Sequence, residues 1–178
     1  FMTTGVYLSY VGLGANLLHL SYCHQIAKKH GPITVITLCK NLEEALADDP
    51  LIKEVFYLDK YHKKLLDIFK LSKFIKSFNF TNFLIFYPSL RIYLAAKLAG
   101  IKKVKSYKYF KKKNLHLVKA AQSLTKNFLD TESCNTETRF FVKKEKIENV
   151  KKELNDSSFK IVLGVGSSGP TTRWGSKN

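Results

Sequence analysis

The protein has 178 residues, of which 45% are hydrophobic and 25% charged, and this composition excludes a disordered or fibrous chain. Its formal net charge of +16 predicts an anionic partner, such as nucleic acid, a phosphorylated glycan, a nucleotide or an acidic membrane face. A solvated basic surface without such a partner is the alternative interpretation. The three cysteines are widely spaced, so they predict neither a zinc site nor a disulfide framework, and they fit a reducing cytoplasm.

The opening stretch, residues 6–20, predicts a buried strand, a glycine turn and the start of a helix. Gly12 and Gly14 allow a tight turn and leave room for a ligand, and Asn16 is expected to cap a helix over 16–30. Free N–H groups at such a turn suit an anionic group. Residues 1–27 contain no Asp, Glu, Lys or Arg, but glycines and polar residues interrupt them, so no transmembrane helix is predicted. Both ends of the chain are those expected of a fragment.

Strands and helices are then predicted in alternation. Further strands are expected at 33–38, 55–58, 83–86 and 102–107, and helices at 41–47, 62–77, 88–99, 114–127 and 144–154. A short strand at 140–142 and a last strand at 160–165 complete the pattern. The apolar stripe of the long helix is predicted at Leu65, Leu66, Phe69, Phe74 and Ile75. This alternation predicts an α/β fold with a Rossmann-like, doubly wound parallel sheet.

The glycine turn does not complete a dinucleotide-binding fingerprint. Residues 12–17 contain two of its three glycines, and Lys40 stands near the end of the second strand, where NAD-binding folds usually carry an acid. NAD is therefore disfavoured, and NADP, with Lys40 near its 2′-phosphate, stays open as an alternative. No cofactor and no metal are predicted.

Six stretches in the same order resemble motifs of one enzyme family. They are the turn at 12–18, the strand at 33–35, the D-P-x-[IV] segment at 49–55, the S-x-[RK] helix at 89–100, the H-x-V motif at 116–118 and the glycine- and serine-rich turn at 166–174. Together they resemble glycosyltransferase family 9, the ADP-heptose:lipopolysaccharide heptosyltransferases. This resemblance implies the N-terminal half of a GT-B glycosyltransferase. Residues 1–155 are expected to form its acceptor-binding domain, and 158–178 the truncated start of its nucleotide-sugar-binding domain.

The resemblance implies an inverting, metal-independent transfer, in which a base removes the proton of the acceptor hydroxyl. The family's usual base is an Asp that follows the second turn glycine, but this sequence has Ala15 there. His19 lies four residues later, on the same helix face, and is the substitute base that the sequence offers. A packed structural histidine is the alternative interpretation of His19.

The remaining predicted site residues follow from the matched motifs. Acceptor binding is expected at Gly12, Gly14, Asn16, Arg91 and His116, although a surface ion pair would equally explain Arg91. Thr172 stands where relatives commonly carry a phosphate-binding Lys, and Arg173 follows it. The donor phosphates are expected at Ser167, Ser168, Thr171, Thr172 and Arg173. A hydrophilic turn that only caps the next helix is the alternative there.

The expected partners are a nucleotide-sugar donor, ADP-heptose, and an anionic lipopolysaccharide core or lipid A acceptor. Clustered lysines at 102–119 and 60–76 fit that acceptor and peripheral contact with an anionic membrane, at the cytoplasmic side of a bacterial inner membrane. The fragment alone is expected to be inactive. Two alternatives stay open: a divergent member that binds glycan or nucleotide without turnover, and a basic Rossmann-like module that binds nucleic acid.

Overall fold

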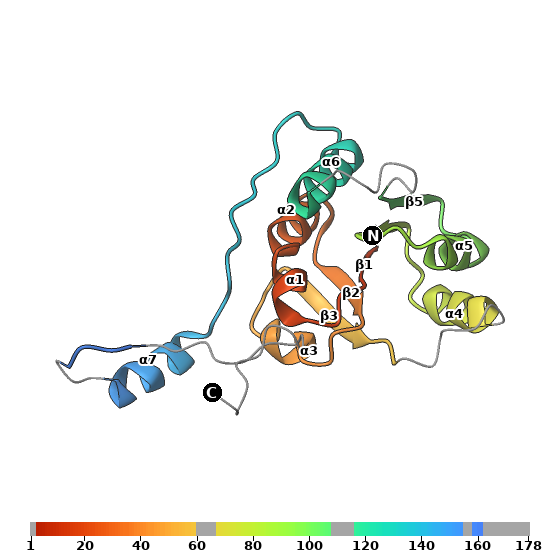
Figure 1. Ribbon diagram of the computed structural model, residues 1–178. Helices are drawn as coiled ribbons and strands as arrows, with labels where there is room; N and C mark the ends of the chain where they lie inside the picture. The colour runs from red at the N-terminus through yellow and green to blue at the C-terminus, as the bar shows by residue number, and fades with distance from the viewer. Residues whose placement is uncertain (1–2, 60–66, 108–115, 155–157, 162–178) are drawn as a thin grey trace, which may run out of the picture. The chain divides into compact units, whose positions relative to one another are not determined.

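The computed structural model describes residues 3–59, 67–107, 116–154 and 158–161, and it divides into two units, residues 1–141 and 142–178 (Figure 1). The first unit contains a sheet with helices on both faces. The second contains α7 (Lys144–Glu153), a helix that buries none of its side chains within the described structure. Among the described residues, no helix combines the length and the apolar character needed to cross a membrane.

The sheet has five parallel strands in the order β3-β2-β1-β4-β5. Their bounds are β1 Thr4–Leu8, β2 Ile33–Thr37, β3 Ile52–Tyr57, β4 Asn82–Ile85 and β5 Lys103–Ser106. The five strands predicted between residues 6 and 107 are confirmed, although β3 begins earlier than expected. Val6 of β1 is in register with Val35 of β2 and Leu84 of β4. The central strands are buried along their whole length, as their continuous apolar sequences predict.

Helices cover both faces of the sheet (Figure 1). One face packs against α2 (Leu20–His30) and α6 (Leu117–Leu129), and its core contains Val6, Leu8, Ile26 and Phe128. The other face packs against α4 (Asp67–Lys76) and α5 (Leu90–Leu98), and its core contains Tyr7, Phe83, Leu71 and Ile92. Alternate residues of β1 therefore serve opposite cores, which is the two-residue period of a strand.

The first predicted helix is interrupted. It forms as α1 (Leu13–Leu17) and α2, separated by Leu18 and His19. The amide of His19 donates to the carbonyl of Asn16 at 3.0 Å, three residues back, and this tighter turn ends α1. The short helix α3 (Leu42–Ala45) forms where a helix was expected.

Two further predictions were wrong. Residues 140–142 form no strand, because they pair with no strand of the sheet. Phe69 does not join the buried stripe of α4; its side chain is 63% exposed, whereas Leu71 and Ile75 are buried. Leu65 and Leu66 of that stripe, and most of the strand expected at 160–165, lie outside the described residues.

Candidate functional site

The strand order reverses at β1, which lies between β2 and β4. In open parallel sheets, ligands bind beyond the carboxyl ends of the strands at such a switch point. Here that place is bounded by the segments that follow β1 and β4, residues 9–12 and 86–89. The glycine turn continues from the first segment and Arg91 from the second, so both predicted elements border the switch point.

The turn after β1 is held by Asn16 rather than by its glycines. The buried Asn16 amide donates to the carbonyls of Tyr10 at 2.7 Å and of Gly12 at 2.8 Å. The N-cap is Gly12, in an extended conformation, so the expected capping role of Asn16 was wrong. Neither Gly12 nor Gly14 has a positive φ, and a Cβ at Gly14 would meet no atom within 4 Å. The turn thus leaves open space beside Gly14.

His19 is fully buried and uses both ring nitrogens. Nδ1 lies 2.7 Å from the carbonyl oxygen of Ala15, and Nε2 lies 2.9 Å from the hydroxyl of Tyr107. Because the carbonyl of Ala15 can only accept, Nδ1 carries the proton and Nε2 accepts the hydrogen of the Tyr107 hydroxyl. Burial lowers the pKa of His19 below its usual 6.5, and the hydrogen bond to Ala15 partly opposes that shift.

A cluster of aromatic rings surrounds His19 at this edge of the sheet. The Tyr10 ring stacks on the imidazole with centroids 5.2 Å apart, and the Phe86 ring meets it edge-on at the same distance. Tyr87 lies edge-on to Tyr10 at 6.0 Å. Burial, reinforced by Tyr87, raises the pKa of Tyr10 to about 12, so this hydroxyl is neutral and can donate a hydrogen bond.

Our sequence analysis missed these tyrosines as site residues. Tyr10, Tyr87 and Tyr107 follow β1, β4 and β5 within two residues of each strand's carboxyl end. Parallel neighbouring strands end at one edge, so the three rings gather there. The signal that could have found them is this repeated position after a strand.

Arg91 lies in the first turn of α5, whose N-cap is Ser89. The Ser89 hydroxyl accepts the N–H of Ile92 at 3.3 Å. The positive charge of Arg91 acts on the Tyr7 hydroxyl: burial raises the pKa of Tyr7 to about 12, and Arg91 opposes part of that rise. Arg91 thus lies in the helix that follows β4, and the residue is half-buried.

His116 has a capping role. Its Nδ1 accepts the N–H of Val118 at 3.3 Å at the start of α6, and the residue is exposed. Its expected acceptor-binding role stays a prediction. The predicted donor-phosphate residues, Ser167 to Arg173, lie outside the described residues. Within the part of the chain that the structure describes, no three His, Cys, Asp or Glu side chains lie close enough together to hold a metal ion.

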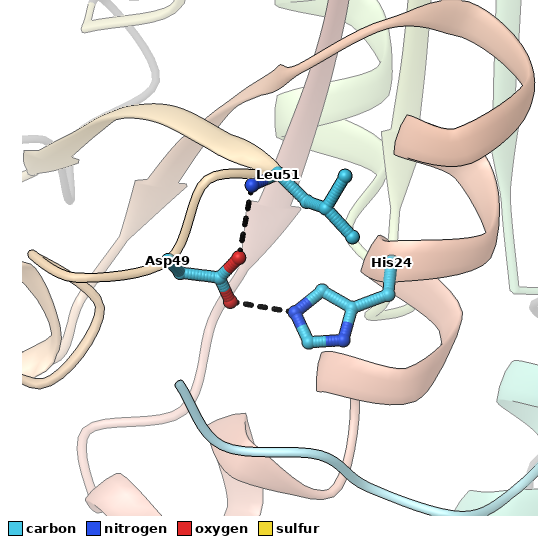
Figure 2. Close-up of polar contacts among 3 residues, drawn as sticks. All are labelled: His24, Asp49 and Leu51. Carbon is cyan, nitrogen blue, oxygen red and sulfur yellow. Dashed lines mark hydrogen bonds and ion pairs between the residues drawn. The ribbon is translucent and has the colours of Figure 1, made fainter. Parts of the chain in front are cut away.

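A second polar pair lies away from this edge, beside the beginning of β3. His24 of α2 contacts Asp49 at 2.6 Å between Nε2 and Oδ2, and Asp49 Oδ1 accepts the N–H of Leu51 at 3.0 Å (Figure 2). Their side chains are only 7% and 2% exposed. Asp49 is the first residue of the D-P segment that the sequence analysis matched. The pair fixes the entry to β3 against α2.

Two solved glycosyltransferase structures are similar to this chain. One is a glycosyl transferase family 9 protein from Veillonella parvula DSM 2008, with a TM-score of 0.69 and 17% sequence identity; the match covers 98% of this chain and 56% of that one. The other is the ADP-heptose lipopolysaccharide heptosyltransferase II of E. coli, with a TM-score of 0.55, 15% identity and coverage of 88% and 52%.

The predicted fold class is confirmed. The chain has a Rossmann-like α/β fold and spans about half the length of the solved structures that it matches. No protein-family model matches the sequence, and no curated protein matches it. At these identities the likeness concerns the fold, and it agrees with the family resemblance drawn from the six sequence motifs.

Proposed function

We propose that this chain is the acceptor-binding half of a glycosyltransferase that transfers heptose, or a related sugar, from a nucleotide-sugar to a lipopolysaccharide-like acceptor. The observation that carries the proposal is the position of His19, Tyr107 and Tyr10 at the switch point, beside the open space at Gly14. Tyrosine rings stack on sugar rings, and their hydroxyls form hydrogen bonds with sugar hydroxyls. The motif order and the fold of the two matched structures support the same reaction class.

The proposed proton acceptor is His19, acting through Tyr107. The acceptor sugar's hydroxyl gives its proton to the Tyr107 oxygen as that hydroxyl attacks the anomeric carbon. Tyr107 passes its own proton to Nε2 of His19, and the nucleoside diphosphate leaves the anomeric carbon with the bonding electrons. The carbonyl of Ala15, 2.7 Å from Nδ1, then stabilises the imidazolium. Transfer by direct attack inverts the anomeric configuration and uses no metal.

The donor is proposed to bind at Ser167, Ser168, Thr171, Thr172 and Arg173, together with residues beyond this chain, and the acceptor at Gly12, Gly14, Asn16, Arg91 and His116. Arg91 suits an anionic group on the acceptor, because a guanidinium binds phosphate or carboxylate through two parallel hydrogen bonds. ADP-heptose is the donor we propose to test first.

The test measures ADP release from ADP-heptose, with and without acceptor, by the protein in its complete natural sequence. The proposal expects acceptor-dependent release. A matched change, Tyr107→Phe, keeps the ring but removes the proton path, so it should lower kcat about 100-fold or more with little change in KM. No release from any nucleotide-sugar would show that the proposed reaction is wrong.

The second candidate function is binding without turnover. It is favoured by Ala15, which cannot accept a proton, and by the complete burial of His19. In that case glycan or nucleotide binding is measurable by calorimetry while ADP release is absent. Ala15→Asp would then create activity, whereas an active wild type would exclude this candidate.

A further inference from the structure

The outward side of α5 is apolar. Leu90, Leu94 and Leu98 recur every four residues and are 58%, 41% and 57% exposed. The opposite side of the same helix buries Ile92, Ala95 and Ala96 against the sheet. An ordinary surface helix has one apolar side and one polar side, but α5 has two apolar sides.

The neighbouring helix α4 extends this surface. It packs beside α5 on the same face of the sheet (Figure 1). Its outward side exposes Phe69, at 63%, among Lys70, Lys73 and Lys76. By contrast α2 and α6, every residue of which the structure describes, expose no large apolar side chain on the other face. Among the four long helices that pack on the sheet, the exposed large apolar residues therefore lie on α4 and α5.

The same layer carries charge of one sign. None of the 14 acidic residues of the protein lies between 68 and 129, so α4, β4, α5, β5 and α6 contain no Asp or Glu beyond Asp67. The exposed charged side chains of the two helices are all cations: Lys70, Lys73, Lys76 and Lys97. Apolar and basic side chains together, without acids, are typical of helices that lie in the interface of an anionic bilayer.

We propose that the α4–α5 face, formed by Phe69, Leu90, Leu94 and Leu98 with these four lysines, binds an anionic lipid bilayer. The leucines and Phe69 enter the boundary between headgroups and acyl chains, and the lysines contact the headgroups. The amino end of α5 follows β4 directly, so the face adjoins the switch point. A lipid-linked acceptor would then reach the site from the membrane; this last step rests on the proposed function, but lipid binding does not.

Other occupants fit the face less well. A second copy, docked through a twofold axis, would set this face, which carries only positive charge, against an identical face. Nucleic acid would match the charge but would leave the leucines without apolar contacts. A bilayer with acidic headgroups satisfies both features, because it offers negative charge at its surface and hydrocarbon just below it.

The experiment is flotation of the protein, in its complete natural sequence, with phosphatidylcholine vesicles that contain no or about 30% phosphatidylglycerol. The proposal expects salt-sensitive binding to the anionic vesicles. Two variants should each weaken that binding by roughly tenfold or more. They are Leu90→Ser with Leu94→Ser and Leu98→Ser, and Lys73→Glu with Lys76→Glu. Because the changed side chains are exposed, the variants should fold, and circular dichroism checks this.

Matched controls remove the same number of groups elsewhere. Ile147 and Val150 of α7 and Leu154, its C-cap, are exposed where acidic residues accompany the lysines, and their joint change to Ser should leave binding unchanged. Lys28→Glu with Lys53→Glu matches the charge change on other elements. Three results would each overturn the proposal. They are no binding to the vesicles, equal binding by the variants and their controls, and a concentration-dependent dimer that only the leucine variant loses. ADP release with a water-soluble acceptor tests the reaction separately, because the leucine variant should retain it.

Discussion

The buried contact between His24 and Asp49 gives the sharpest stability prediction. Replacing His24 by Ala removes the partner of Asp49 Oδ2 and leaves that oxygen buried, with only Oδ1 still bonded to the N–H of Leu51. Figure 2 shows that both partners of Asp49 come from this small group of residues, one from α2 and one from the segment just before β3.

The magnitude follows from the burial. A hydrogen bond to a charged group contributes about 1.5–3 kcal/mol, and its loss costs most when the carboxylate oxygen that remains is buried. With side chains 7% and 2% exposed, we expect His24→Ala to lower the free energy of unfolding by about 3 kcal/mol. In a unit of this size that lowers Tm by roughly 10 °C.

Urea unfolding followed by circular dichroism measures the change, and a double-mutant cycle isolates the pair. Asp49→Ala combined with His24→Ala removes the unpaired charge, so the double variant should be more stable than the sum of the singles by about 1–2 kcal/mol. The exposed pair of Lys53 and Glu54, 3.9 Å apart, is the control: Glu54→Ala should cost less than about 1 kcal/mol. A cost for His24→Ala no larger than that of Glu54→Ala would refute the argument.

Three further predictions concern β1 and the site. A Cβ at Gly5 would lie 2.6 Å from a ring carbon of Phe83, so Gly5→Ala should destabilise the folded protein by about 1–3 kcal/mol in urea unfolding. Gly14→Ala is the control: its Cβ meets nothing within 4 Å, so this change should leave the stability unchanged or raise it slightly. Burial lowers the pKa of His19 in the folded state, so below about pH 6.5 the unfolded chain binds more protons than the folded one. The stability that neutral His19 contributes is therefore fully present above that pH and is lost as the pH falls. His19→Gln should reduce the slope of the unfolding free energy against pH by up to about 1.4 kcal/mol per pH unit. Tyr107→Phe leaves Nε2 of His19 buried without its donor and should cost about 1–2 kcal/mol, checked by the same unfolding assay; an unchanged midpoint would show that this hydrogen bond contributes no net stability.

The sequence was sufficient for the sheet because each strand carries its own signal. Val6, Val35 and Leu84 belong to short apolar runs bounded by turns, and only parallel strands buried on both faces combine such runs with intervening helices. Phe69 shows the limit of predictions from apolar spacing. Its spacing fits the apolar stripe of α4, yet the residue is exposed, because periodicity identifies apolar positions but not the partner that covers them.

The site was predictable only in part. The switch point follows from strand order, and Gly12 and Arg91 lie on the segments that follow β1 and β4, while their acceptor-binding role stays a prediction. The contacts of His19 with Tyr107 and of His24 with Asp49 join residues far apart in the sequence, and no local pattern encodes which pairs meet. Asn16 illustrates the same limit: its residue type suits a cap, but its side chain reaches back to the carbonyls of Tyr10 and Gly12 instead.

In the proposed reaction, His19 replaces the acid that is absent at position 15. The methyl side chain of Ala15 cannot take a proton from a sugar hydroxyl. Instead the Ala15 carbonyl fixes the tautomer of His19, so that the basic nitrogen faces the Tyr107 hydroxyl. The ring is buried, and burial lowers the pKa of His19, which makes it a weak base; the Tyr107 hydroxyl belongs to a residue that is only half-buried. The hydrogen bonds therefore provide a path for a proton from the sugar to His19. Protonating this buried imidazole costs free energy, and the bound sugar and the negative charge of the leaving nucleotide must offset that cost. The pH dependence of kcat tests this path. It is supported if kcat of the wild type rises with pH through a single ionisation and this rise is lost in Tyr107→Phe. An identical pH profile in the wild type and the variant refutes it.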